Sequence, residues 1–511
     1  MESKIQENNK RLLKNTGAMY CRTFIVLVIS LYITRVILKE LGETDYGVYN
    51  IVGSIVVLFS FLNTSLTQAI QRFITIEVGK NDTCKINTIF NISFLVQILV
   101  AFLVFFLCES VGLFVVNNYI QVGNRINAAN WVFQFSVITT IVSILRIPFE
   151  ALVVANEKMS FYALVSIIEV FLKLSICFLI AFSSGDKLIL YSFLLAGVSL
   201  ISFTIYIVYC KIHFVYSKIK KTWDAKIIKQ ILSFSGWSLL GSVSNLATIS
   251  AFTFLINVYY GVLANAALGI ANQVYAAVNQ FIGNFQSSFR PQIIKSYAAN
   301  EIDYFMKLIF STSKLSYLLI LIPVVVLIFN MPLVLTAWLG NVPKYTVEFC
   351  QLILVCSLFD GLTGSYYCAI TATGKIRKYQ IALSCSFLLD LVLSISLMVI
   401  GIQPEKVLYS RIATRGVLNM LIGLFFMKKL IDFQIKGYVV KVVLPITLLT
   451  LVLACSGEVF KCYFTGWNLL FLSIASCVVL MIIVCNFILS QSEKNNIKLL
   501  WKKIKKKTII M

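Results

Sequence analysis

Histidine is almost absent from this chain of 511 residues, which contains only His213. The thirteen cysteines stand singly, without a Cys-x-x-Cys pair. Zinc sites and Cys–His nucleophile pairs are built from these two residue types. The sequence also lacks the GxxxxGK[ST] nucleotide loop and the HExxH motif. We therefore predict no metal, no cofactor and no enzymatic activity, and we interpret the cysteines as small apolar core residues.

Charged residues are scarce as well, at 13% of the chain, whereas 59% of the residues are hydrophobic. Soluble domains carry about 25% charged residues. Apolar runs long enough to cross a bilayer, which takes about 20 residues, recur from position 16 to position 490. A β-barrel would show short alternating segments instead. The start, "MESKIQENNKRLLKN", lacks the pattern of a cleaved signal peptide. The composition predicts an all-α, polytopic membrane protein.

We predict about fourteen transmembrane helices. They lie at 16–38, 48–71, 86–108, 127–150, 160–183, 188–210, 236–258, 265–289, 308–330, 346–372, 379–401, 405–427, 439–456 and 467–490.

The net charge of +22 is distributed as a membrane topology requires. With the N-terminus inside, lysines and arginines in the inner segments outnumber those in the outer segments by about five to one. A missed span would invert this bias. We therefore expect both termini in the cytoplasm, and we assign the positive charge to topology and membrane lipids, with no nucleic acid as a partner. The short outer loops disfavour a membrane-bound polymerase, which needs a large outer domain.

The longest inner connection is basic and divides the first twelve spans into six and six. Within it, Ile227, Ile228 and Ile231 share one helical face and Lys226 and Lys229 the other, a pattern typical of a helix lying on the inner leaflet. The predicted organisation is an N-terminal tail (1–14), an N-lobe (15–212), the linker (213–235), a C-lobe (236–430), two further spans (431–490) and a basic C-terminal tail (491–511).

A weak internal repeat supports the two lobes. "YGVYNIV" at 46–52 resembles "LGIANQV" at 268–274, and each segment opens the second span of its lobe. A shift of six spans preserves orientation, so the repeat is parallel, and parallel halves predict a central cavity with alternating access.

The stretch "ELGETDYGVYN" at 40–50 separates the first two spans. We expect a tight outer turn permitted by Gly42 and Gly47. Its position, together with the partial repeat, predicts that it belongs to an outer gate. The residues assigned to this gate are Asp45, Tyr46, Gly47 and Asn50.

Charges inside the spans are candidate functional residues, because an intramembrane charge costs about 3 kcal/mol or more. Arg22 lies about two turns inside the first span, and a cavity role is favoured. Arg35 lies near the outer edge, where it could snorkel to the surface. Arg146 precedes Pro148, which could kink or end the fourth span and leave Arg146 at the inner mouth, in a cavity or a topological role.

Glu169 and Lys173 are four residues apart on one face of the fifth span. This spacing predicts a helical ion pair, which could be either a self-neutralised pair or a proton- or phosphate-handling site.

Arg411 and Arg415 share one face of the twelfth span and cannot neutralise each other. They require Asp360, Asp390 or a ligand phosphate. We predict Arg415 as the phosphate contact, since its fork suits phosphate oxygens, and Arg411 as the partner of an acid. The two aspartates are also candidates for ion coupling.

The eighth span carries Gln273, Gln280 and Asn284 at helical spacing, and Arg290 at its inner exit. Interhelical hydrogen bonding would explain such a stripe, but its continuity favours contact with water or sugar.

These residues resemble those of a known family. The segment "NTGAMYCRTFIVLVISLYITRVILKELGETDYGVYNIVGSIVVLFSFLNTSLTQAIQRF" at 15–73 is similar to the start of bacterial polysaccharide-biosynthesis flippases, the O-antigen or capsule repeat-unit translocases of the multidrug/oligosaccharidyl-lipid/polysaccharide (MOP) exporter superfamily. "RIPFEALVVANEKMSFYA" at 146–163 and "YGVLANAALGIANQVYAAVNQFIGNFQSSFRPQI" at 260–293 resemble later junctions of that family.

The resemblance implies two six-helix lobes in a V with two extra helices. It implies transfer of an undecaprenyl-pyrophosphate-linked oligosaccharide across the bacterial cytoplasmic membrane, with a polysaccharide polymerase and a chain-length regulator as further partners. Proton or sodium coupling and uncoupled flipping both stay open. The alternatives are a multidrug/cation antiporter, which would need an acidic cavity, a lipid II flippase, a polymerase and a non-transport scaffold.

Overall fold

The computed structural model describes residues 2–57, 60–118, 125–220, 222–464 and 466–487. Within these ranges every regular element is a helix and there is no strand. Ten of the helices are long and apolar enough to cross a membrane by length and composition. The predicted all-α, polytopic architecture is therefore confirmed. The predicted tail at 491–511 lies outside the described residues.

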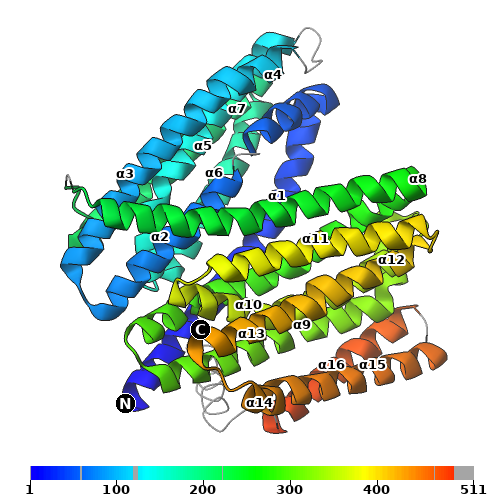
Figure 1. The fold of residues 1–511 in the computed structure, drawn as a ribbon. Coiled ribbons are helices and arrows are strands. Elements are labelled where there is room, and N and C mark those ends of the chain that lie inside the picture. Colours follow the sequence, from blue (N-terminus) through cyan, green and yellow to red (C-terminus); the bar gives the residue numbers. More distant parts are fainter. Residues whose placement is uncertain (1, 58–59, 119–124, 221, 465, 488–511) are drawn as a thin grey trace, which may run out of the picture. The chain divides into compact units, whose positions relative to one another are not determined.

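Figure 1 shows the helices in the order of the chain. They are α1 (Glu2–Val57), α2 (Ser60–Lys80), α3 (Thr83–Leu107), η1 (Cys108–Gly112), α4 (Leu113–Asn118), α5 (Ile126–Ala155), α6 (Met159–Ala181), α7 (Lys187–His213), η3 (Val215–Ser217), α8 (Ala225–Ala298), α9 (Ile302–Leu339), α10 (Thr346–Thr373), α11 (Arg377–Val399), α12 (Pro404–Arg411), η4 (Ile412–Leu418), α13 (Asn419–Ile431), α14 (Ile435–Tyr438), η5 (Val439–Val443), α15 (Leu444–Tyr463) and α16 (Gly466–Phe487).

Two of these helices, α1 and α8, each contain a break at one glycine. Gly42 has φ 77° and ψ 169°, and Gly261 has φ 80° and ψ −179°. Only glycine adopts this region readily, because any Cβ would clash with the backbone. Each break falls between the first and second predicted spans of a lobe. The expectation for Gly47 was wrong: it lies within the helix after the break, and Gly42 alone makes the turn.

The chain divides into two compact units. The N-unit contains residues 15–242 and 294–300. At its centre, α5 packs against α2, α3, α6 and α7, which Figure 1 shows in blue to cyan-green. Its core is aromatic where α3 meets α5, with the rings of Phe90 and Phe149 edge to face at 5.2 Å. Polar side chains of α5 that face neighbouring helices need hydrogen-bond partners on those helices.

The C-unit contains residues 1–14, 243–293 and 301–511. Here α10 packs against α9, α13 and η4, and α15 and α16 both pack on α9. Hydrogen bonds fix these last two helices. Tyr317 and Thr450 join α9 to α15 at 2.8 Å, and the Asn330 amide donates to Ser473 of α16 at 2.9 Å. The two final predicted spans are thus attached through α9.

The structure shows where α5 ends and where α8 begins. Helix α5 continues through Pro148 to Ala155, so the proline does not end it. Arg146 therefore lies nine residues, or about 14 Å along the axis, from the end of α5 and is not at a helix end. In the predicted linker, Asp224 caps α8 by accepting from the backbone of Lys226 and Ile227, and the helix then runs without a break to Gly261.

Candidate functional site

The first polar cluster lies inside the N-unit, where α5, α6 and α7 meet. Arg146 Nη1 of α5 donates to Glu169 Oε1 of α6 at 2.6 Å and contacts Ser202 Oγ of α7 at 3.0 Å. The Ser202 hydroxyl also donates to the same carboxylate oxygen. Both charged side chains are about one quarter exposed. Three neighbouring helices therefore share one partly buried, charged hydrogen-bond network, which we name the Glu169 cluster.

A second carboxylate extends this cluster toward α1. Glu150 lies one turn after Arg146, with Oε2 3.6 Å from Arg146 Nε. It also interacts electrostatically with Arg22 and accepts a hydrogen bond from Tyr162. The Arg22 guanidinium lies over the Tyr162 ring, 5.1 Å from its centre. The structure thus brings Arg22 and Arg146, predicted as separate candidates, to the same carboxylate.

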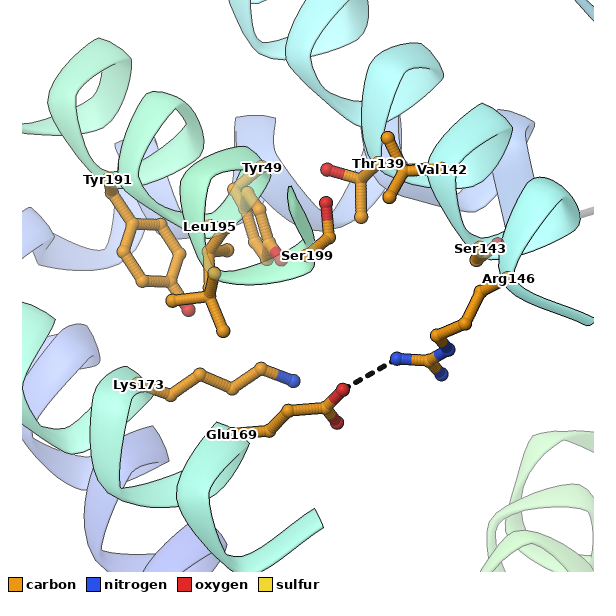
Figure 2. A pocket seen from close by; sticks show the side chains of 11 residues that line it. Tyr49, Thr139, Val142, Ser143, Arg146, Glu169, Lys173, Tyr191, Leu195 and Ser199 are labelled. Carbon is orange, nitrogen blue, oxygen red and sulfur yellow. Dashed lines mark hydrogen bonds and ion pairs between the residues drawn. The ribbon is translucent and has the colours of Figure 1, made fainter. Parts of the chain in front are cut away.

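A pocket of about 290 Å³ opens beside this cluster (Figure 2). Its polar lining includes hydroxyls of α1, α5 and α7, and both Glu169 and Lys173. Among the described residues, the Lys173 Nζ makes no ion pair, and the acid that precedes it by one turn is bonded to Arg146 instead. The predicted Glu169–Lys173 pair is therefore replaced by a pair between helices, because Arg146 approaches the carboxylate more closely.

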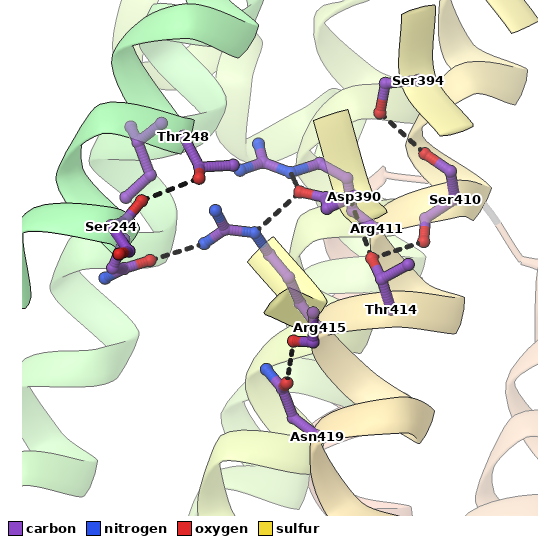
Figure 3. A network of polar contacts seen from close by, with 12 residues as sticks. Ser244, Thr248, Asp390, Ser394, Ser410, Arg411, Thr414, Arg415 and Asn419 are labelled. Atoms are coloured by element: carbon purple, nitrogen blue, oxygen red, sulfur yellow. Dashed lines mark hydrogen bonds and ion pairs between the residues drawn. The ribbon is translucent and has the colours of Figure 1, made fainter. Parts of the chain in front are cut away.

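The second polar cluster lies inside the C-unit and is centred on Asp390 of α11 (Figure 3). Arg415 Nε donates to Asp390 Oδ2 at 2.9 Å, and Arg411 Nε lies 3.5 Å from the same oxygen. Thr414 Oγ1 donates to Asp390 Oδ1 at 2.8 Å. The Asp390 side chain is completely buried. One carboxylate thus serves both arginines, and Arg415, which we expected to be free for phosphate, is the closer of the two.

Further contacts hold these arginines in place. Arg415 Nη1 donates to Asn245 Oδ1 of α8 at 2.8 Å, while its Nη2 is buried and has no hydrogen-bond partner among the residues that the structure describes. The guanidinium of Arg411 lies 4.2 Å from the centre of the Phe252 ring, a cation–π contact. Arg415 itself belongs to η4, a π-helical turn, and such turns occur frequently at functional sites.

Asp360 of α10 lies near this Asp390 cluster but has its own partner. Tyr275 of α8 donates its hydroxyl to Asp360 Oδ2 at 2.7 Å, and Arg415 acts on this carboxylate electrostatically. Of the predicted stripe on α8, Gln273 and Gln280 are exposed, whereas Asn284 is buried and donates to the Gln280 carbonyl. The stripe is therefore partly open and partly used in packing.

Arg290 lies apart from the Asp390 cluster. It interacts with Cys368 and Tyr367 of α10, and its buried Nε has no hydrogen-bond partner in the described part of the chain. Arg35 on α1 is exposed. No group of three or more His, Cys, Asp or Glu side chains that could hold a metal occurs in the described part of the chain.

The elbow residue Asp45 takes part in an ionic cluster at one end of the N-unit. Arg125, just before α5, contacts Asp45 with Nε at 2.8 Å and Nη2 at 2.6 Å. It also binds Asp186, the residue that caps α7, at 2.8 and 3.0 Å. Lys187 pairs with Glu40 at 2.9 Å. We name these five residues the elbow cluster, which ties the turn at Gly42 to the starts of α5 and α7.

The electrostatics of the elbow cluster follow from its geometry. Partial burial raises the pKa of the Asp186 carboxyl, but hydrogen bonds from Arg125 and from the first turn of α7 outweigh it, so the net pKa lies below its usual value. The bonds to Asp186 and Asp45 raise the pKa of Arg125. Of the other gate residues, Tyr46 packs in the α1–α7 core and Gly47 is helical, and the Asn50 side chain lies outside the described residues.

Several residues of these clusters were not predicted as site residues. Glu150 and Arg125 were overlooked, although each is a charge close to a predicted span end. Tyr49 and Tyr191 line the pocket from α1 and α7, with ring centres 5.1 Å apart. An aromatic residue in a membrane helix carries no signal that separates pocket lining from packing.

Neither a scan of protein-family models nor a search of curated proteins returned a match. Solved structures do match. A mutant MATE crystal structure gives a TM-score of 0.74 at 10% identity over 83% of this chain and 96% of that one. An outward-facing multidrug resistance MATE family transporter of the MOP superfamily gives 0.71 at 12% identity, over 83% and 96%. A MOP superfamily transporter from Pyrococcus furiosus, whose binding pocket is described as of reverse polarity, gives 0.68 at 13% identity, over 83% and 96%. The chain has the fold of the MATE transporters.

Proposed function

We propose that this protein is a membrane transporter that moves a lipid-linked, anionic oligosaccharide, of the polyprenyl-pyrophosphate type, from the inner to the outer leaflet of a bacterial cytoplasmic membrane. The observation that carries the proposal is a charged cluster within the apolar helices of each unit, partly buried in the N-unit and buried in the C-unit. Charges at this depth are expensive and are typically retained for substrate or ion handling. The fold shared with MATE transporters supports the transport part of the proposal.

The sign of the charge favours an anionic cargo. In the Glu169 cluster and its pocket, three cations face two carboxylates: Arg22, Arg146 and Lys173 against Glu150 and Glu169. Arg290 adds a further cation in the C-unit. A carrier of cationic drugs would need the opposite excess. One structure of the same fold is described by its reverse pocket polarity and a suggested different function, which supports the idea that this fold carries cargoes of either sign.

The chemistry of transport follows from this arrangement. A pyrophosphate head cannot cross bare hydrocarbon, because desolvating its charge costs more than packing contacts return. Buried arginine and lysine donors replace its water, and hydroxyl and amide side chains replace the water around the sugars. Alternating access to the two sides of the membrane then removes the barrier. Glu169, Asp360 and Asp390 are the carboxylates we propose for any ion coupling, and both termini are proposed to face the cytoplasm.

The proposal is tested by reconstitution. Purified full-length protein in liposomes should move a fluorescent polyprenyl-pyrophosphate sugar between leaflets, measured as loss of signal to a membrane-impermeant quencher. In cells lacking their own repeat-unit flippase, the chain should restore surface glycan. R22A and D390N should reduce both signals at least tenfold, whereas S396A, which changes an exposed hydroxyl on α11, should not.

The rival functions predict other outcomes. A multidrug antiporter of this fold would confer resistance to cationic drugs without moving the lipid-linked sugar. A lipid II flippase would restore growth after depletion of the cell's own lipid II flippase. Either result without transfer of the oligosaccharide carrier would overturn the proposal.

A further inference from the structure

Lys173 lies in the middle of α6 and makes no ion pair with any residue that the structure describes. It lies fourteen residues after the start of α6 and eight before its end, is exposed, and lines the N-unit pocket. No carboxylate of the described residues is within ion-pair distance of its ammonium. Because an intramembrane lysine rarely persists without a partner, its position requires a ligand or water to solvate it.

The two carboxylates of the Glu169 cluster are already engaged. Glu169 accepts from both Arg146 and Ser202. Glu150 interacts with Arg146 and Arg22 and accepts from Tyr162. Two acids therefore balance two arginines, and the positive charge that is left over belongs to Lys173, which projects into the same pocket (Figure 2).

The C-unit offers no equivalent excess in its Asp390 cluster. Arg415 is bonded to Asp390 at 2.9 Å and to Asn245 at 2.8 Å, and Arg411 is buried against Phe252. With Asp360 close enough to act on Arg415, two acids face two arginines there as well. Asp390 already neutralises Arg415, of which only Nη2 lacks a hydrogen bond to a described residue, whereas no carboxylate of the described residues pairs with Lys173.

The walls of the N-unit pocket suit a phosphate head. Its volume of about 290 Å³ lies just below the roughly 300–1,000 Å³ typical of ligand pockets, so it fits a head group and not an oligosaccharide. Hydroxyl groups of α1, α5 and α7 line the pocket together with Lys173. They belong to Tyr49, Thr139, Ser143, Tyr191 and Ser199. Hydroxyls donate to phosphate oxygens, and lysine binds phosphate as a point charge.

We infer that this pocket is a binding subsite for a phosphate-type anion, with the Lys173 ammonium as its primary contact and Arg146, held by Glu169, as a positioning residue. The inference rests on the proposed function. It identifies the phosphate group as the part of the cargo that this pocket binds, and it places that contact at Lys173 instead of Arg415. The anion could belong to free pyrophosphate, to a prenyl pyrophosphate or to a phospholipid head group, which share this chemistry, and of these we assign the prenyl pyrophosphate.

The test is a binding measurement on the full-length protein in nanodiscs of zwitterionic lipid. Farnesyl pyrophosphate, inorganic pyrophosphate and farnesol are titrated separately, with farnesol giving the baseline for partition into the bilayer. K173Q should weaken farnesyl pyrophosphate binding about tenfold, and K173R should stay within about threefold of the original chain. K406Q, which removes an exposed lysine of α12, is the matched control and should bind normally.

Each arm has a decisive outcome. Equal binding by K173Q and the unchanged protein, in a sample with unaltered thermal unfolding, overturns the subsite. Equal weakening by K406Q overturns it too, since the effect would then be general charge. Two results would overturn the assignment to a prenyl pyrophosphate. One is stronger binding of inorganic pyrophosphate than of farnesyl pyrophosphate. The other is loss of the Lys173-dependent signal when the nanodiscs contain phosphatidylglycerol. The liposome transport assay tests the proposed function independently of the subsite. If the protein transports the lipid-linked sugar but K173Q binds farnesyl pyrophosphate normally, the subsite is rejected and the proposed function is not.

Discussion

Asp390 accepts from Arg415 at 2.9 Å while its side chain is completely shielded from solvent. Replacing it by asparagine leaves Arg411 and Arg415 on one helical face without an anionic partner. Removing one member of a buried ion pair costs about 3 kcal/mol. We expect D390N to lower the thermal unfolding temperature in detergent and to abolish transport.

The same pair allows a double-mutant cycle. If the loss in D390N comes from uncompensated positive charge, adding R415Q should restore part of the stability, with a coupling of about 1 kcal/mol or more. S396A on the same helix is the control and should unfold like the unchanged protein. Strictly additive losses in the double variant would contradict a direct Asp390–Arg415 interaction.

The break in α1 predicts opposite effects for two neighbouring glycines. Gly42 lies in a region of φ and ψ that is essentially restricted to glycine, so G42A should destabilise the protein by about 1–3 kcal/mol although no atom lies within 4 Å of the added methyl group. Gly47 is helical and also has open space, so G47A should be neutral or stabilising by about 0.5–1 kcal/mol. Thermal unfolding measures both, and equal effects would show that the turn is not at Gly42.

The same comparison can be made in α8. There G261A should destabilise the protein and G269A should not, because only Gly261 has a positive φ and neither glycine has a neighbour within 4 Å. The readout is again the unfolding temperature of the purified protein. A destabilising G269A with a neutral G261A would place the break elsewhere.

The elbow cluster predicts acid sensitivity. The folded-state pKa of Asp186 is lowered, so its contribution is present above the ordinary aspartate pKa of about 3.9 and is lost as the pH falls through that value toward the folded pKa. Because Arg125 and Asp186 are about one third exposed, we expect their ion pair to contribute only about 0.5–1 kcal/mol to the free energy of unfolding. Unfolding temperatures from pH 7 to pH 3 should fall less steeply for R125Q than for the unchanged protein. Parallel curves would contradict this role for Arg125.

Native cysteines test the membrane orientation. Cys84 and Cys462 are both exposed and unpaired, and the charge distribution assigns them to opposite sides. In spheroplasts, a membrane-impermeant maleimide should label Cys462 directly and Cys84 only after permeabilisation. C84S and C462S identify the two signals, and the reverse pattern would invert the proposed topology.

How far the sequence predicts the structure depends on the range of the interaction. The all-α class and the apolar helices follow from composition and periodicity, which act locally. The partner of Glu169 does not, because Lys173 is one turn away in sequence whereas Arg146 becomes a neighbour only when α5 packs on α6. Likewise, the sequence offers both Gly42 and Gly47 as turn residues. Only the backbone angles of the structure show that the turn is at Gly42. Sequence alone cannot rank such candidates, since the deciding contacts are between helices.

The single-residue break at Gly42 has a consequence for how this sequence can change. A loop between two helices absorbs insertions and deletions. Here the two helical segments are joined directly, and Gly42 is the one non-helical residue between them. Each residue gained or lost after it would rotate the following helix by about 100°. Val48 and Val52, one turn apart and both buried, would leave the core together. We therefore expect homologous chains to vary in residue identity along this segment while keeping its length fixed.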